Sequence, residues 1–189
     1  MRKSLLFVWA CMGLVCLVSA CKTSVKSKEW KLVWVENFDQ KNSFDESVWT
    51  KIPRGTSDWN NYMSYYDSCY AMQDGNLILR GIANHTQKND TAPYLTGGVY
   101  TKGKKLFTGG RVEVCARLQA AKGAWPAIWM LPEKAEWPKG GEIDIMERLN
   151  HDHIAYQTTH SYYTHILGIK DNPPHGGINK INPEEYNIY

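Results

Sequence analysis

The chain has 189 residues, five cysteines and a formal net charge of +3. It has no lysine- or arginine-rich run, so we do not expect a nucleic-acid partner. No cysteine spacing resembles a zinc site, and no metal site is predicted. The length suffices for one domain with a hydrophobic core, even after removal of an amino-terminal leader.

The amino terminus has the pattern of an export signal. Arg2 and Lys3 precede an apolar run over residues 5–18, which is too short and too soon interrupted to predict a membrane span. Small residues then lead directly into Cys21, which resembles a bacterial lipobox. The resemblance implies cleavage before Cys21 and lipidation of its thiol and new amino group, and two lipid signals make a firm anchor. The alternative is an ordinary secretory signal with a chance cysteine.

Three segments are therefore expected: a lipoprotein signal peptide (1–20), a lipidated cysteine with a polar tether (21–29), and one domain (30–189). This organisation predicts a monomer in the bacterial cell envelope, anchored to the outer membrane on its periplasmic or surface face. Cys69 and Cys115 remain after processing. They are predicted either to pair in an oxidising compartment or to be two buried free thiols.

Short segments with strand character dominate the domain, and Gly, Asn and Pro separate them. Helical periodicity is confined to residues 43–52, where Ser43 or Asp45 would cap a single turn. Asp74 and Gly75 predict a tight hairpin turn. The strand-like segments are 30–38, 75–83, 97–118 (two strands around a turn at 102–104), 125–131, 141–149 and 154–165. Together they predict an antiparallel sandwich or barrel.

The carboxyl-terminal segment has a different character. Residues 171–185 are predicted to form a long loop, and residues 186–189 resemble the beginning of a strand. Because all-β sandwiches of this kind often extend to about 200–250 residues, we expect an incomplete domain with an open sheet edge.

Three carboxylates are concentrated in the segment 141–149. Side chains alternate along a strand, so Glu142 and Asp144 point to one face and Glu147 would point to the other. One extra residue at Ile145 and Met146, a β-bulge, would bring Glu147 back to the first face. The sequence therefore predicts a bulged strand with three acids on one face.

Paired carboxylates of this kind suit glycoside hydrolysis. A retaining glycosidase needs two carboxyl groups about 5–5.5 Å apart, one as nucleophile and one as acid. The Cα atoms of Glu142 and Glu147 would lie roughly 13 Å apart, a gap that two glutamate side chains can largely close. The charge of Asp144 would raise the proton affinity of a neighbour, and its hydrogen bond would orient the nucleophile. The alternative is a solvated strand face without function.

Tryptophans precede the acidic segment. Trp125, Ala127 and Trp129 alternate on one strand face and would form a platform for a sugar ring. The alternative is a pair of core tryptophans. His160 is a further candidate in the next strand, where a structural hydrogen-bonding role fits equally well.

These segments together resemble glycoside hydrolase family 16, in its laminarinase-like branch. The resemblance covers roughly residues 30–189 and is most specific in the segments 123–132 and 137–150. It implies a concanavalin-like β-jelly roll of two curved antiparallel sheets, here C-terminally incomplete. It also implies an endo-acting, retaining hydrolase of β-linked glycans that needs no cofactor for catalysis. Its motif implies that Glu142 is the nucleophile, Asp144 its helper and Glu147 the acid/base, with Trp125, Trp129 and His160 in the cleft.

The chain departs from this family in residues 60–67, which shape one side of the cleft in many members. Arg54, Trp59 and Asn61 are additional cleft candidates, although Arg54 fits a surface position equally well. The substrate is therefore predicted to be β-1,3-glucan, mixed-linkage glucan or algal galactan, or a mucin O-glycan cut at internal β-1,4-galactosyl bonds, which gut-bacterial members of the family cleave. Some members hold a structural calcium near segments such as 36–39 and 74–76, and this ion is expected only in a complete domain. The competing hypotheses are a non-catalytic carbohydrate-binding lipoprotein and an inactive fragment of the enzyme.

Overall fold

The computed structural model describes residues 29–40 and 42–189. The chain divides into two compact units, residues 1–35 and 36–189, and the second holds every strand described below. The predicted signal peptide, the lipidated Cys21 and most of the tether lie outside the described residues. Within the described ranges, no helix is long and apolar enough to cross a membrane.

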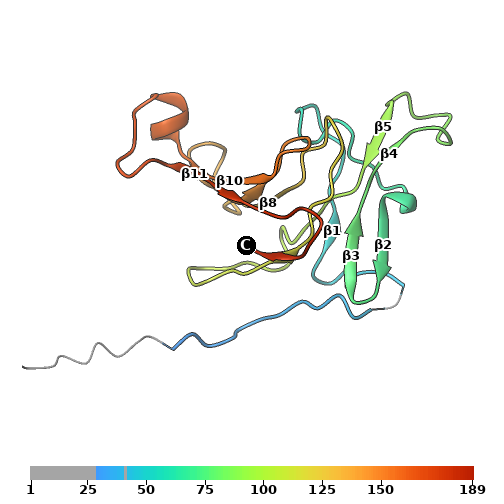
Figure 1. The fold of residues 1–189 in the computed structure, drawn as a ribbon, viewed down its shortest axis with the longest axis horizontal. Helices are drawn as coiled ribbons and strands as arrows, with labels where there is room; N and C mark the ends of the chain where they lie inside the picture. Colours follow the sequence, from blue (N-terminus) through green and yellow to red (C-terminus); the bar gives the residue numbers. More distant parts are fainter. Residues whose placement is uncertain (1–28, 41) are drawn as a thin grey trace, which may run out of the picture. The chain divides into compact units, whose positions relative to one another are not determined.

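The regular secondary structure of the second unit consists almost entirely of short strands joined by loops (Figure 1), as the sequence predicts. A 3₁₀ turn, η1, covers Asp67–Cys69 and a π-helical turn, η2, covers Tyr162–Ile166. The strands are β1 (Thr50–Lys51), β2 (Tyr70–Gln73), β3 (Asn76–Leu79), β4 (Gly81–Ala83), β5 (Tyr94–Thr96), β6 (Val99–Tyr100), β7 (Cys115–Ala116), β8 (Ala127–Met130), β9 (Glu142–Glu147), β10 (Ile154–His160), β11 (Gly176–Lys180) and β12 (Asn187–Ile188).

The largest sheet has four antiparallel strands in the order β11-β10-β9-β8. The other strands form the antiparallel pairs β1-β6, β12-β7, β2-β3 and β4-β5. In Figure 1 the four-stranded sheet carries the yellow and orange part of the chain, and β2 to β5 carry the green part. The central strand β9 therefore has a hydrogen-bonded neighbour on each side.

The predicted β-bulge in β9 is confirmed by the strand register. Against β10, Glu147 lies opposite Tyr156 and Asp144 lies opposite Thr158. Between these two pairs β9 therefore contains one residue more than β10. Against β8, the register slips at the same place, between Met146 and Asp144. Both neighbours thus locate the extra residue in the Ile145–Met146 region.

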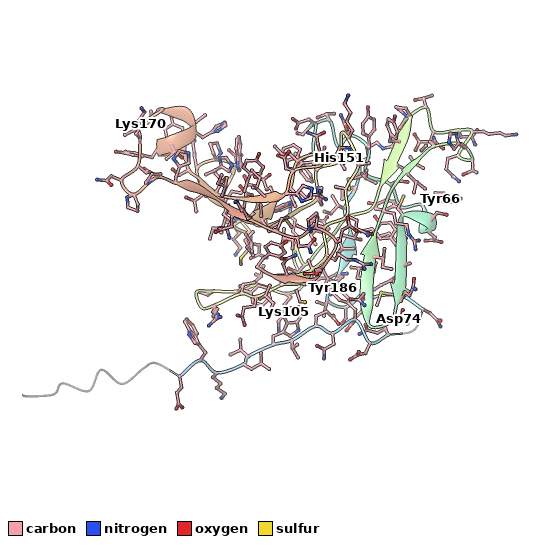
Figure 2. The ribbon with its side chains drawn as sticks, in the orientation of Figure 1. Tyr66, Asp74, Lys105, His151, Lys170 and Tyr186 are labelled. Atoms are coloured by element: carbon pink, nitrogen blue, oxygen red, sulfur yellow. The ribbon has the colours of Figure 1, made fainter. Side chains whose placement is uncertain are left out.

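The hairpin predicted at Asp74 and Gly75 is also present. Both residues have positive φ, 52° and 69°, and they join β2 to β3. Figure 2 shows Asp74 at the tip of this hairpin. Two consecutive positive φ angles match the twist of the flanking strands, which explains why Asp-Gly is favoured at this turn.

Two local predictions are wrong. Residues 30–38 form no strand, although they alternate. The segment 171–185 is no continuous loop, because β11 forms within it and is exposed along its whole length as the edge strand. By contrast, residues 43–52 do contain the single turn expected there: the Asp45 carbonyl accepts from the Val48 and Trp49 N–H groups at 3.0 and 2.8 Å, and the Asp45 carboxylate caps the turn by accepting from the Ser47 N–H at 2.8 Å. The strand expected after residue 185 is present as β12.

The core beneath the four-stranded sheet contains Leu118, Met146 and Ala155, all buried. Arg148 is also buried, and its guanidinium donates to the carbonyl oxygens of Leu118 and Asp152. Met146 belongs to β9 and lies in the bulge region, so a core side chain comes from the same irregularity that re-aims Glu147.

The two described cysteines are both free. Cys69 is fully buried at the end of η1, and Cys115 is exposed in β7. The predicted pairing is therefore absent, and the alternative of two buried thiols holds for Cys69 only. Burial raises the pKa of the Cys69 thiol.

Candidate functional site

The three acids lie along β9, which is one of the two inner strands of the four-stranded sheet. Glu142 is opposite His160 of β10, and Asp144 is opposite Trp129 of β8. Asp144 is the most buried of the three, with a side chain only 4% exposed. Glu142 and Glu147 are half-buried at the two ends of the strand.

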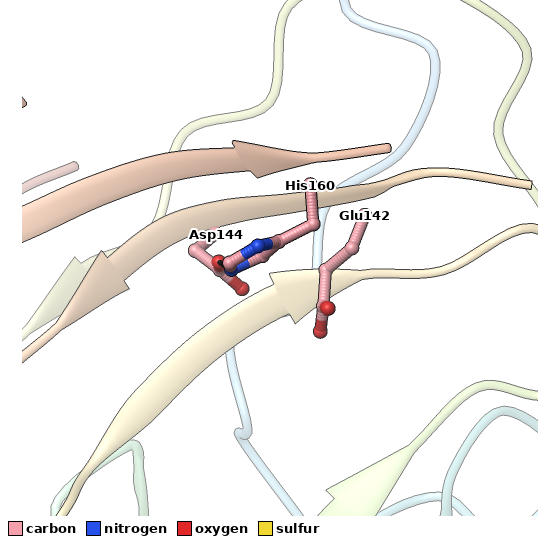
Figure 3. A group of neighbouring side chains, drawn as sticks. All are labelled: Glu142, Asp144 and His160. Atoms are coloured by element: carbon pink, nitrogen blue, oxygen red, sulfur yellow. Dashed lines mark ion pairs between the residues drawn. The ribbon is translucent and has the colours of Figure 1, made fainter. Parts of the chain in front are cut away.

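A ring nitrogen contacts each of the three acids: the two glutamates accept hydrogen bonds, and the aspartate makes an ion-pair contact. The Trp137 indole N–H donates to Glu142 Oε2 at 2.7 Å, and the Trp125 indole N–H donates to Glu147 Oε1 at 2.8 Å. Between them, His160 Nε2 lies 3.2 Å from Asp144 Oδ2. Figure 3 shows the imidazole of His160 against Asp144, with Glu142 beside them.

The electrostatics of the site centre on Asp144. Burial first, and then the charges of Glu147 and Glu142, together raise the pKa of Asp144 to about 6, while His160 opposes the shift. The bulge in β9 turns Glu147 toward the side that carries Glu142 and Asp144, as expected from the sequence, and the charges of both glutamates act on Asp144. The raised pKa belongs to Asp144 itself, and the ion-pair contact of its carboxylate is with His160.

A hollow of about 350 Å³ opens beside the Glu142 end of the strand. Its lining includes both Glu142 and His160 and otherwise consists of apolar side chains, glycines and a threonine: Met130, Leu131, Pro132, Gly140, Gly141, Ile143 and Thr159. A space of this size, bounded by a few polar groups, is of the scale that small ligands occupy.

The structure brings two of the predicted cleft tryptophans together. Trp59 and Trp129 meet edge to face, with ring centroids 5.6 Å apart. Since Trp129 is opposite Asp144, the 57–62 turn that carries Trp59 lies beside the acidic strand. Trp125 is 45% exposed, so its ring keeps an open surface while its N–H is bound to Glu147.

The two polar cleft candidates have different surroundings. Arg54 makes a two-pronged ion pair with Asp90, both contacts at 2.7 Å, and its Nε donates to the Met63 carbonyl. The Arg54 guanidinium holds the pKa of Asp90 down at about 2. This arginine therefore ties two loops together. Asn61 Oδ1 is buried and has no hydrogen-bond partner within the described part of the chain.

Two site residues were not anticipated from the sequence. Trp137 binds Glu142, and His165 packs edge to face on Trp137 with ring centroids 4.5 Å apart. Trp137 stands only five positions before Glu142, so its proximity in sequence was an available signal. No local signal marks His165, because its contact with Trp137 depends on the path of the chain after β10.

Two groups of carboxylates are candidates for holding a cation. Ligand atoms of Glu142, Asp144 and His160 lie within 4.8 Å of one another, so the geometry permits a cation there. The predicted calcium region is less suitable. A Cβ at Gly75 would lie 3.7 Å from Asp39 Oδ1, so the two segments meet, but both Glu36 carboxylate oxygens already accept from Phe38 and Trp49. Calcium prefers 6–8 oxygen ligands, and these residues offer an incomplete set.

Comparison with known proteins agrees with this geometry. A family model described as "XgeA-like, catalytic GH16 domain" matches residues 71–176. The keratan-sulfate endo-1,4-beta-galactosidase of Sphingobacterium multivorum is 42% identical over 144 residues, which are 74% of this chain and 34% of that protein. The beta-glucanase of Rhodothermus marinus is 32% identical over 178 residues, 89% of this chain and 61% of that protein. This chain thus spans about one third of the length of the first relative and about three fifths of the length of the second.

The structural comparison gives the same class. The laminarinase structure from Rhodothermus marinus aligns with a TM-score of 0.72 at 30% identity, covering 85% of this chain and 66% of that one. An all-β chain with acids on one bulged strand and tryptophans beside them is thus a glycoside-hydrolase domain with a jelly-roll fold. The chain belongs to glycoside hydrolase family 16.

Proposed function

We propose that the chain is the catalytic part of an endo-acting, retaining glycosidase that cleaves internal β-glycosidic bonds of a glycan. The observation that carries this proposal is the set of three acids on one side of β9, each held by a ring nitrogen. A non-catalytic binding protein would not need a pair of carboxylates at the two ends of one strand, so that alternative is not favoured.

The roles follow from the surroundings of each acid. Glu142 acts as the nucleophile, and its carboxylate attacks the anomeric carbon to give a glycosyl-enzyme intermediate. The Trp137 N–H fixes one oxygen of Glu142, which leaves the other oxygen to attack. Glu147 protonates the leaving oxygen and then takes a proton from the water that releases the sugar. Asp144, paired with His160, maintains negative charge between them.

The proposed substrate is a glycan with internal β-1,4-galactosyl bonds, such as a mucin-type O-glycan. The relative with 42% identity is named for an endo-1,4-beta-galactosidase activity, and this supports a galactosyl substrate over a glucan. The beta-glucanase relative, at 32% identity, supports β-1,3- or mixed-linkage glucan as the second candidate.

The cellular setting is proposed from the sequence of the leader. The run ending at Cys21 supports a lipid anchor in the outer membrane of a bacterial envelope, with the domain on the periplasmic or surface face. We also propose that the protein acts as a monomer, and that any structural calcium depends on ligands in addition to Asp39.

The test is mass spectrometry of products after incubation with keratan-type and mucin O-glycans, mixed-linkage glucan and laminarin in parallel. We expect oligosaccharides from the galactosyl substrates, and none from the Glu142→Gln variant, since the amide cannot act as the nucleophile. Products from the glucans alone would reject the galactosyl assignment. Equal product from the variant would reject the role of Glu142.

A further inference from the structure

We propose that His165 is a positioning residue for the reaction: it holds Trp137 against Glu142 and so fixes the nucleophile. This inference rests on the proposed function for its kinetic consequence. The contact of His165 with Trp137, in contrast, is given by the structure and does not depend on the proposed function. Trp137 is the residue through which His165 acts.

The first step is the bond between Trp137 and Glu142. The indole N–H of Trp137 donates to Glu142 Oε2 at 2.7 Å, a short contact to a carboxylate. A carboxylate with one oxygen fixed has a defined orientation for the other. Attack requires the reacting atoms to be held near 3–3.5 Å with aligned orbitals, so a displaced oxygen costs rate rather than affinity.

The second step concerns what holds Trp137. Its backbone belongs to the compact segment 132–141, in which Gly140 donates to the Glu136 carbonyl and packs against Pro132. The Trp137 side chain, however, is 48% exposed. A half-exposed ring is not fixed by core packing, so its orientation depends on lateral contacts.

The third step identifies those contacts. His165 meets the Trp137 ring edge to face at 4.5 Å between centroids, whereas His160 lies at 6.4 Å. The two histidines also face each other at 6.0 Å, so three rings surround the Glu142 end of the site. Edge-to-face pairs at this separation are favourable beyond the area that they bury.

The fourth step shows that His165 is itself held in place. It lies in η2, where Ser161 and Thr164 form a reciprocal capping box and the His165 N–H donates to the Ser161 carbonyl at 2.8 Å. The turn follows β10 directly, so the strand that presents His160 also presents His165. His165 is thus an exposed residue in an ordered turn, and it packs on the Trp137 ring that binds Glu142. It can therefore fix the orientation of that ring.

The experiment is ¹H–¹⁵N spectroscopy of the indole N–H groups, combined with kinetics. The chain has 8 Trp, and the Trp137 resonance is assigned by its loss in Trp137→Phe. We expect His165→Ala to move or broaden that resonance, and Glu142→Gln to move it also. His165→Phe keeps the edge-to-face ring and should leave it near its original position. Tyr163→Ala, in the same turn and 49% exposed, is the matched control.

The kinetic expectation is a loss in kcat of roughly 10-fold for His165→Ala with a smaller change in KM. An unmoved Trp137 resonance in His165→Ala would overturn the inference, as would an equal loss in Tyr163→Ala. If the unaltered chain cleaves none of the glycans, the proposed function fails, and the spectra alone then decide the contact.

Discussion

At the scale of single residues, Asp144 carries the largest electrostatic cost in the site. Its carboxyl is almost fully buried, and the two glutamates on the same strand oppose its ionisation. His160 compensates only in part. A group with such an environment is retained for what it does to its neighbours rather than for stability.

The first prediction concerns stability and pH. The pKa of Asp144 is raised from 3.8 to about 6 in the folded chain, so the folded state binds its proton more tightly than the unfolded state does. Stability is therefore lost as the pH rises from about 4 to about 6, and the cost is complete above that window. The Asp144→Asn variant removes this cost, and His160 can still donate to the amide oxygen.

We expect Asp144→Asn to be more stable than the unaltered chain by about 1–2 kcal/mol at pH 7.5, with little difference near pH 4. Urea unfolding at both pH values measures the two free energies. A variant that is less stable at pH 7.5, or that keeps the pH dependence of the unaltered chain, would contradict the argument. Hydrolysis by the variant should fall, because charge between the two glutamates is lost.

At the scale of elements, the sequence predicted best where a short-range rule applies. The five-residue spacing from Glu142 to Glu147 predicted the bulge, because alternation along a strand is strict. Asp74 and Gly75 predicted the hairpin, because few residue pairs tolerate two positive φ angles. Both signals are complete within a few residues.

The elements that were wrongly predicted depend on partners far along the chain. Residues 30–38 alternate but form no strand, and Leu32 is 75% exposed. Conversely, β11 carries Gly-Gly-Ile-Asn-Lys, which has little strand character, yet it pairs with β10 along its full length. An edge strand is defined by the neighbour that it pairs with, and local propensity then decides little. The contact of His165 with Trp137 escaped prediction for the same reason.

The second prediction tests the packing of two elements. A Cβ at Gly97, which follows β5, would lie 2.5 Å from the carbonyl oxygen of Cys69. That atom is backbone, so it cannot rotate away. We expect Gly97→Ala to lower the free energy of unfolding by at least about 2 kcal/mol, measured by urea unfolding.

The matched control is Gly177→Ala in β11, where an added Cβ meets nothing within 4 Å. It should change the free energy of unfolding by no more than about 0.5 kcal/mol. Equal effects of the two substitutions would show that the Gly97 contact does not limit stability.

At the scale of the whole molecule, the two described thiols report on different states. Cys115 is exposed, whereas Cys69 is fully buried beside Gly97. We expect iodoacetamide to label Cys115 rapidly in the folded protein and Cys69 only after unfolding, because the Cys69 thiol is inaccessible and its pKa is raised. Peptide mapping by mass spectrometry at increasing urea concentration measures both.

Labelling of Cys69 should follow the same urea dependence as the loss of tertiary structure. Rapid labelling of Cys69 without urea would show that the β2 to β5 region opens independently of the rest. A Cys69–Cys115 disulfide in the purified protein would contradict the structure directly.

The ring nitrogens on the three acids have a consequence for the potential inside the cleft. Indole N–H groups orient Glu142 and Glu147 but carry no full charge, so they do not neutralise the carboxylates. The carboxylates therefore keep a negative potential along this side of β9, which in the proposed reaction would favour the positive charge that develops on a sugar ring at the transition state. The same potential repels an anionic substituent next to the bond that is cut. A sulfated or sialylated chain would have to present an uncharged unit at this point and carry its charges outward.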